Sequence, residues 1–267
     1  MSRIKACFAT LKENRRKALV PFVTAGDPTL DATVPLLHIL AENGADLIEL
    51  GVPFSDPMAD GPVIQLADER ALANGVTTIK ILEMVREFRK TNSTTPIVLM
   101  GYLNPVEIYG YAKFAKDAAA AGVDGMIVVD LPPEASKPLT DEFDKVGLDC
   151  VFLLAPTTKT ARIEKIAKAA RGYLYYVSVK GVTGAGHLDV DAVNEKLETI
   201  RKITDLPITV GFGIKDGATA RLVGQQADGV VVGSALVKIV EQHQQDRQAL
   251  HSSIAAFMQS LRQGLDQ

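Results

Sequence analysis

Residues 111–133 read YAKFAKDAAAAGVDGMIVVDLPP, and this stretch contains one complete repeat of the pattern that decides the fold. Residues 111–121 have a helical pattern, and Gly122 follows where a left-handed residue can end a helix. Residues 125–129 are a continuous apolar run, as expected of a strand buried on both faces of a parallel sheet. The stretch therefore predicts a helix, a buried parallel strand and a loop, in that order.

The same pattern recurs along the chain. Gly44 and Gly147 stand, like Gly122, between a helical pattern and a strand. We expect strands at residues 18–23, 46–50, 96–100, 125–129, 149–154, 173–177, 207–210 and 229–232. We expect helices at residues 30–41, 79–90, 111–121, 134–146, 161–170, 190–203, 216–225 and 235–262.

Eight strand–helix repeats predict a (β/α)8 barrel, because right-handed crossovers wind such a chain in one direction until eight strands can close. The length of 267 residues suits one such α/β domain over residues 1–267. The interval after the second strand is the longest and predicts an extra loop and helix there. A doubly wound open sheet is the structural alternative.

The charge balance argues against nucleic acid and membranes as partners. With 29 basic and 32 acidic residues the net charge is −3, so no positive field attracts phosphate backbones or anionic lipid. No apolar run is long enough to span a bilayer, and residues 1–16 lack the apolar core of a secretory signal. Cys7 and Cys150 fit a reducing compartment better than a disulfide framework. We therefore expect a cytoplasmic protein.

Two carboxylates stand where a barrel carries its chemistry, at the C-terminal end of a strand. Glu49 lies between Ile48 and Leu50, where loss of water raises the pKa of a carboxyl and keeps it partly protonated. Asp60 lies in the following loop, PFSDPMADGPVIQ (residues 53–65), whose polar setting predicts an ionised group. The pair indicates acid/base chemistry. The plain alternatives are a paired interior carboxylate for Glu49 and a helix-capping turn residue for Asp60.

Glycines crowd the loops after the last three strands, and these loops are neighbours in a closed barrel. Backbone N–H groups there can converge on a phosphate in front of a helix dipole, without a lysine or arginine. The candidates are Gly184, Gly213, Gly233 and Ser234.

These strand ends resemble those of a known family, the α subunit of tryptophan synthase, over nearly the whole chain. The matching stretches are PFVTAGDP (21–28), ELGVPFSDP (49–57), ADGP (59–62), NP (104–105), GVTG (181–184), GFG (211–213) and GSA (233–235). The loop after the second strand is the specific part of the match. A lone GFG or GS would carry little weight.

The resemblance implies a reaction and a partner. The reaction is the retro-aldol cleavage of indole-3-glycerol phosphate to indole and glyceraldehyde 3-phosphate in tryptophan biosynthesis. The partner is a β subunit that carries pyridoxal phosphate and receives the indole, in an α2β2 heterotetramer. No cofactor is expected in this chain.

The resemblance also implies roles for single residues. Glu49 protonates C3 of the indole, Asp60 holds and polarises the indole N–H, and Tyr175 lies in the active site. Substrate contacts are expected from Phe22, Tyr102, Thr183 and Phe212, and Thr183 also orders the loop after the sixth strand. From the sequence alone Tyr175 can equally be a core aromatic, core packing is the default interpretation of Phe22 and Phe212, and Thr183 can be a turn residue.

A partner surface is expected on the same face as the two carboxylates, at Asp56, Pro57 and Asn104. The four histidines are scattered without ligand spacing, so no metal site is expected.

The chain departs from the family pattern at Val179 and Lys180, where arginine and a small residue are common, and at Ala135, where an acidic residue is common. The first two departures concern loop closure. Lys180 also opens an alternative, a Schiff-base aldolase or another phosphate-binding barrel lyase or isomerase, although a solvated loop lysine is the plainer interpretation. A stand-alone indole-releasing lyase and a non-catalytic regulatory subunit are two further interpretations of the chain.

Overall fold

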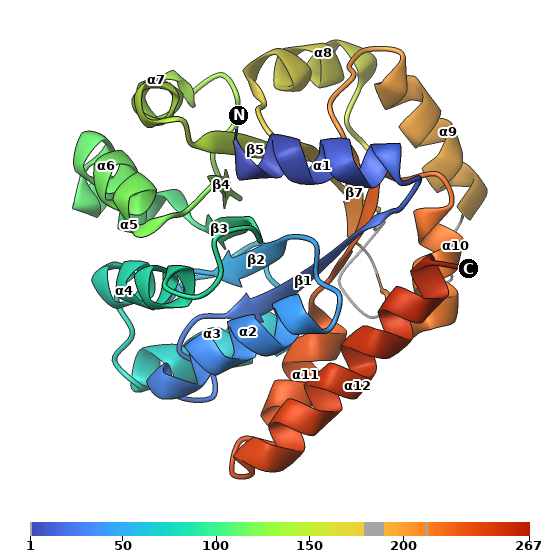
Figure 1. The fold of residues 1–267 in the computed structure, drawn as a ribbon. Helices are drawn as coiled ribbons and strands as arrows, with labels where there is room; N and C mark the ends of the chain where they lie inside the picture. The colour runs from blue at the N-terminus through green and yellow to red at the C-terminus, as the bar shows by residue number, and fades with distance from the viewer. Residues whose placement is uncertain (1, 179–189, 212) are drawn as a thin grey trace.

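The computed structural model describes residues 2–178, 190–211 and 213–267 (Figure 1). Within these residues, eight parallel strands form a closed barrel in chain order. They are β1 (Ala18–Thr24), β2 (Ile48–Gly51), β3 (Ile97–Gly101), β4 (Gly125–Val128), β5 (Asp149–Leu154), β6 (Leu174–Val177), β7 (Ile208–Gly211) and β8 (Gly229–Val232). β1 closes the ring by pairing with β8. The predicted (β/α)8 barrel is confirmed, and the open-sheet alternative is wrong.

Helices surround the barrel. They are α1 (Arg3–Glu13), α2 (Thr33–Glu42), α3 (Pro62–Ala73), α4 (Thr78–Arg89), α5 (Leu103–Tyr109), α6 (Tyr111–Ala121), α7 (Lys137–Val146), α8 (Thr160–Ala169), α9 (Val190–Arg201), α10 (Gly217–Gly224), α11 (Ser234–Gln242) and α12 (Arg247–Leu265), with a 3-10 turn η1 (Leu30–Ala32) before α2. α3 is the extra helix predicted after the second strand. α1 and α5 are additional to the predicted helices.

α1 closes the N-terminal end of the barrel. Its residues Ile4, Phe8 and Leu11 recur about once per turn and join the apolar cluster of inward-facing side chains at the strand starts. The ring of Phe8 lies 5.7 Å from the ring of Tyr173. The C-terminal end of the barrel therefore remains for the site.

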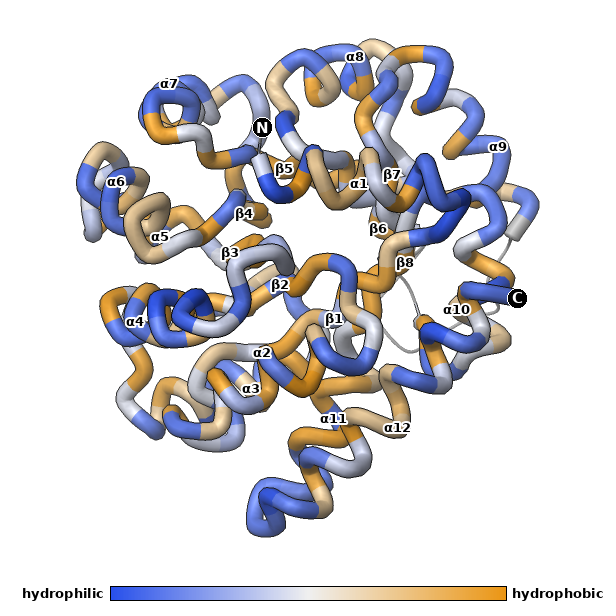
Figure 2. The backbone as a smooth tube through the Cα atoms, in the orientation of Figure 1, coloured by the Kyte–Doolittle hydropathy of each residue, from blue (hydrophilic) through white to orange (hydrophobic). Residues whose placement is uncertain are grey.

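Side chains of the strands alternate between two apolar layers. Val20 and Ile127 belong to the inner cluster, whereas Leu19 and Leu99 belong to the cluster between strands and helices. Hydrophobic and hydrophilic positions alternate along the surrounding helices in Figure 2, as amphipathic helices on a barrel require.

Two predicted helices differ from the observed ones. The helix expected at 134–146 begins at Lys137, because Pro132 and Pro133 start turns in which Ser136 Oγ donates to the Pro133 carbonyl at 2.9 Å. The helix expected at 235–262 is two helices, α11 and α12. The Asp246 carboxylate accepts a 2.9 Å hydrogen bond from the Ala249 N–H and starts the second one.

The predicted glycine caps are confirmed. Gly122 and Gly147 end α6 and α7 in the left-handed region, with φ of +93° and +76°. Gly44, just after α2, has a φ of +103°.

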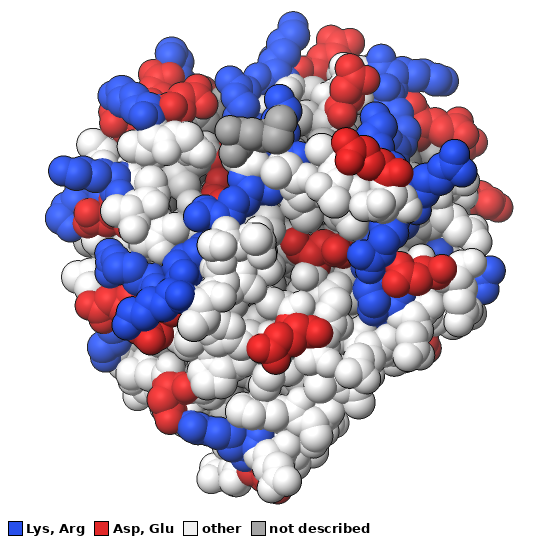
Figure 3. Space-filling view, in the orientation of Figure 1, with Lys and Arg blue, Asp and Glu red and all other residues white. Residues whose placement is uncertain are grey.

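The surface carries both signs of charge. Figure 3 shows basic and acidic side chains interspersed on the face that α1 covers. Both cysteines are free. None of the described helices is long and apolar enough to cross a membrane.

Candidate active site

The carboxyl of Glu49 lies inside the barrel and is fully buried. It points inward because its neighbours Ile48 and Leu50 belong to the outer apolar layer. Oε1 accepts a 2.7 Å hydrogen bond from the Tyr173 hydroxyl. Oε2 has no hydrogen-bond partner among the described residues. One oxygen is thus fixed, and the other is available to a reacting molecule.

Burial raises the pKa of Glu49 to about 8, and the hydrogen bond from Tyr173 offsets part of the rise. A carboxyl with such a pKa is mostly protonated at neutral pH and can act as a general acid. The predicted rise is confirmed, with the predicted cause.

Two aromatic side chains lie near Glu49. Phe22 stands opposite it in the β1–β2 register and is 7% exposed. Tyr175, half-buried on β6, has a pKa raised first by burial and then by the charges of Glu49 and Asp60. Tyr175 therefore lies within electrostatic range of both carboxyls.

Two glycines make room for these rings. A Cβ at Gly51 would lie 2.7 Å from the Phe22 ring, and a Cβ at Gly211 would lie 2.0 Å from the Tyr175 hydroxyl. Neither position tolerates a side chain while the ring stays in place.

Asp60 is held at the mouth of the barrel by Tyr102. The Tyr102 hydroxyl donates to Asp60 Oδ2 at 2.7 Å and accepts from the Ala59 N–H at 2.9 Å. Burial raises the pKa of Asp60 and the bond from Tyr102 lowers it, with burial the larger cause. The polar sequence of the loop did not predict this rise in the pKa of Asp60, because the burial that causes it comes from the fold. The capping alternative is wrong, because the N-cap of α3 is Gly61 and no side chain caps it.

The predicted phosphate residues that the structure describes follow two neighbouring strands. Gly233 and Ser234 start α11 directly after β8, and Gly213 (φ +48°) follows β7, which pairs with β8. The first N–H groups of a helix have no partner within it and favour an anion. A Cβ at Gly233 would lie 3.8 Å from the Phe22 side chain, so this helix start is next to Phe22.

Several predicted residues lie outside the described part of the chain. They are Val179, Lys180, Thr183, Gly184 and Phe212.

The predicted partner residues are at the surface. Asp56 and Asn104 are exposed and Pro57 is half-buried. Two apolar side chains share their segments, Met58 at 78% exposure and Ile108 at 83%. Because α5 begins directly after Tyr102, the hydrogen bond from Tyr102 to Asp60 joins this surface to the site.

Two functional candidates were absent from the sequence prediction. Tyr173 is two residues before Tyr175, so the alternation of a strand predicts that both face inward. Asp68 on α3 is 5% exposed, and its pKa is raised to about 7 by burial and by the charge of Asp60. The sequence feature that could have indicated Asp68 is its place, as an acidic residue, on the buried face of α3 with Ala67 and Ala71.

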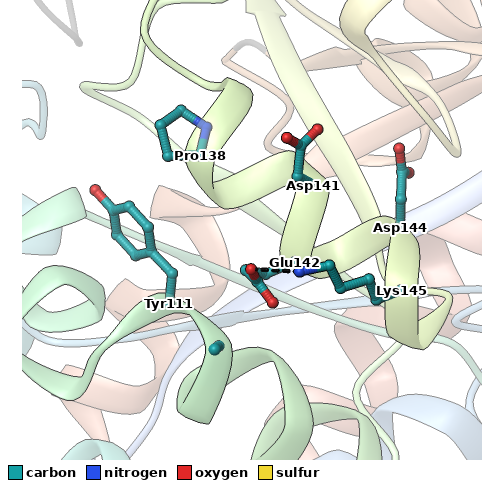
Figure 4. A pocket seen from close by; sticks show the side chains of 7 residues that line it. Tyr111, Pro138, Asp141, Glu142, Asp144 and Lys145 are labelled. Atoms are coloured by element: carbon teal, nitrogen blue, oxygen red, sulfur yellow. Dashed lines mark hydrogen bonds and ion pairs between the residues drawn. The ribbon is translucent and has the colours of Figure 1, made fainter.

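A groove of about 680 Å3 lies elsewhere, between α6 and α7 (Figure 4). Tyr111, Asp141, Glu142 and Lys145 line it, and Lys145 pairs with Glu142 at 2.7 Å. Its carboxylates are at least a quarter exposed in their side chains. The groove is on the outer ring of helices and carries no buried acid.

Fold and site together define a barrel of the acid/base class of enzymes, with a buried carboxyl of raised pKa inside the barrel and the N-terminus of a helix at its mouth. The sequence profile of the family described as "Tryptophan synthase alpha chain" matches residues 8–266. The tryptophan synthase alpha chain of Thioalkalivibrio sulfidiphilus is 56% identical over 266 residues, 100% of both chains. That of Chromobacterium violaceum is 60% identical over 241 residues, 90% of this chain and 91% of that one.

Solved structures agree. Tryptophan synthase subunit alpha of Legionella pneumophila superimposes with a TM-score of 0.92 at 46% identity, covering 100% of this chain and 99% of that one. An aminoacrylate-bound tryptophan synthase of Mycobacterium tuberculosis gives 0.89 at 34% identity, covering 99% of this chain and 100% of that one. The chain belongs to the tryptophan synthase alpha chain family.

Proposed function

We propose that Glu49 and Asp60 carry the reaction of this chain, each in a distinct role. The reaction of the tryptophan synthase alpha chain family is the lyase cleavage of indole-3-glycerol phosphate to indole and glyceraldehyde 3-phosphate. It requires a proton at indole C3, a base for the side-chain hydroxyl and support for the indole N–H.

Glu49 is the proton donor to C3. The observation that carries this role is its fully buried carboxyl, with Oε1 held by Tyr173 and Oε2 without a partner among the described residues. After the transfer the carboxylate accepts the proton of the side-chain hydroxyl. The electron pair of the C–C bond then returns to the ring, which releases indole and an aldehyde. Glu49 ends protonated again, so the cycle balances.

Asp60 accepts the hydrogen bond of the indole N–H and stabilises the positive charge of the protonated ring. Its position supports this role, since Tyr102 holds the carboxylate at the mouth and Tyr175 lies within electrostatic range of it. Phe22, Tyr102 and Phe212 contact the indole, and Thr183 orders the loop. Gly184, Gly213, Gly233 and Ser234 hold the phosphate.

The protonated indole is itself the electron sink, so the cleavage needs no imine on Lys180. Treatment with indole-3-glycerol phosphate and borohydride should leave the intact mass unchanged. A reduced adduct at Lys180 would instead support the aldolase mechanism.

We infer that the surface at Asp56, Pro57 and Asn104 binds a tryptophan synthase β subunit, in an α2β2 complex whose pyridoxal phosphate belongs to that subunit. The exposed Met58 and Ile108 support an apolar interface there. A cytoplasmic location fits this biosynthetic role.

The experiment is indole release from indole-3-glycerol phosphate, with and without a β subunit. We expect slow release alone and a faster rate with the partner, because a bound partner orders loops that otherwise lose entropy in each turnover. Asp56→Ala should weaken the activation and leave the isolated rate within about twofold, since Asp56 is exposed. No indole release under either condition would contradict the proposed function. Full activity without the partner, unchanged on its addition, would support a stand-alone lyase.

A further inference from the structure

The turn Gly26-Asp27-Pro28, which belongs to the matched sequence stretches, is hydrogen-bonded to α3 and its C-cap through the Asp27 side chain and two carbonyl oxygens. Arg70 of α3 donates two hydrogen bonds to Asp27, Nε to Oδ1 at 2.8 Å and Nη2 to Oδ2 at 2.9 Å. The Asp27 side chain is 2% exposed. Such a two-pronged arginine–carboxylate pair fixes orientation as well as distance.

One helical turn after Arg70, the residue that caps the C-terminus of α3 binds the same turn. Asn74 Nδ2 donates to the carbonyl oxygens of Gly26 at 3.0 Å and Pro28 at 2.7 Å. Arg70 and Asn74 are four residues apart and so share one face of the helix. The turn therefore serves as a docking point for α3.

The Arg70 guanidinium also reaches a third element. Its Nη1 lies 3.5 Å from Glu241 Oε1 on α11. α3 and α11 pack against each other (Figure 1), over an apolar cluster of Phe22, Ala67 and Val237. Arg70 thus joins α3 to the Gly26-Asp27-Pro28 turn and to α11.

The N-terminal ends of these two helices hold opposite ends of the proposed site. α3 begins at Pro62, two residues after Asp60, and Gln65 Nε2 donates to the Asp60 carbonyl at 2.8 Å. α11 begins at Ser234, in the proposed phosphate site. Because a helix moves as a rigid rod, the seating of α3 on α11 determines where Asp60 stands relative to the phosphate.

We propose that Arg70 is a positioning residue, which through Asp27 and Glu241 sets the distance between Asp60 and the phosphate-binding start of α11. The inference rests on the proposed function, because it assigns the two ends of the substrate to these helices. Arg70 touches no substrate itself.

The test compares conservative variants of two half-buried arginines. Arg70→Lys keeps the charge but loses the two-pronged bond to Asp27. Arg89→Lys is the matched control: Arg89 pairs with the 3% exposed Asp124 at 2.8 Å, and Asp124 lies just before β4, at the end of the barrel opposite the site. Both variants should lower the unfolding temperature to a similar degree, so assays are made well below both transitions.

We expect kcat for indole release to fall about tenfold in Arg70→Lys, with glyceraldehyde 3-phosphate still bound within about threefold of wild type. Arg89→Lys should keep both values within about twofold. Glu241→Gln, a 40% exposed position with a longer contact, should lower kcat about two- to threefold. Unchanged kcat in Arg70→Lys, or equal losses in Arg70→Lys and Arg89→Lys, would overturn the proposal. Absence of cleavage in the wild type would contradict the proposed function instead.

Discussion

Glu49 is buried inside the barrel, whereas Asp60 lies on a loop at its mouth. Glu49 is on a strand, fully buried, with one hydrogen bond from Tyr173. Asp60 is half-buried, is bonded by Tyr102, and leads into a helix that Arg70 docks onto the rest of the barrel. Burial raises the pKa of both carboxyls and brings that of Glu49 to about 8.

The difference shows how one chemical group can serve two roles. Each carboxyl accepts one hydrogen bond from a tyrosine, so burial is the difference between them. A carboxyl fully deprived of water keeps its proton and can donate it. A half-buried carboxyl that reaches solvent keeps more of its charge and can stabilise a cation. Substitutions at the two carboxyls and at Tyr173 test this contrast.

Glu49→Gln should lower the single-turnover rate of indole release about a thousandfold, because it removes the proton donor to C3. General acid catalysis contributes about a hundredfold to ten-thousandfold. Substrate affinity should stay within about threefold, since glutamine keeps the size of the side chain. The exposed Glu83→Gln is the control and should keep the rate. Activity of Glu49→Gln within about threefold of wild type would contradict the mechanism.

The same variant should gain stability relative to wild type as the pH rises. Unfolded Glu49 releases its proton near pH 4.5 and folded Glu49 near pH 8, so between these values folding takes up a proton. The contribution of Glu49 to the stability of wild type is fully present below pH 4.5 and is lost as pH rises through about 8. Relative to wild type, the unfolding free energy of Glu49→Gln should rise by about 3 kcal/mol from pH 5.5 to 8.5. Denaturant titrations measure it, and a difference independent of pH would contradict the raised pKa.

Asp60→Asn should lower kcat about thirtyfold, less than Glu49→Gln, because an amide oxygen still accepts the indole N–H but carries no charge. Substrate binding should change less than kcat. The exposed Asp205→Asn serves as the control. A larger loss in Asp60→Asn than in Glu49→Gln would reverse the proposed roles.

Tyr173→Phe should shift the pH dependence with a small loss of rate. The Tyr173 bond lowers the pKa of Glu49, so its removal raises that pKa further. Activity falls when Glu49 ionises, so the alkaline limb of kcat/KM should move upward by up to about one pH unit. Tyr176→Phe alters a neighbouring tyrosine of the outer layer and should leave the limb in place. A downward shift in Tyr173→Phe would mean that the bond stabilises the protonated acid.

Elements with one continuous apolar run could be predicted from sequence to within a few residues, as β5 and β8 show. α1 escaped prediction because its charged residues mask the three apolar positions Ile4, Phe8 and Leu11. The break between α11 and α12 depends on a single side-chain cap at Asp246, which outweighs a long amphipathic pattern.

Features of the site that depend on the neighbours of one residue in the sequence could be predicted. Features that depend on a contact between distant residues could not. The direction and cause of the Glu49 shift follow from Ile48 and Leu50 on either side of it. The bonds from Tyr173 to Glu49 and from Arg70 to Asp27 join residues 124 and 43 positions apart. Only the closed barrel brings such residues together.

The most direct test is the titration of the Glu49 carboxyl itself. In protein labelled with 13C at the glutamate side-chain carboxyls, the resonance missing from Glu49→Gln identifies the group, and its chemical shift is followed from pH 5 to 9.5. We expect a midpoint near pH 8, with a higher one in Tyr173→Phe. A midpoint near the ordinary value of 4.5 would leave Glu49 ionised at neutral pH and would contradict its role as the acid.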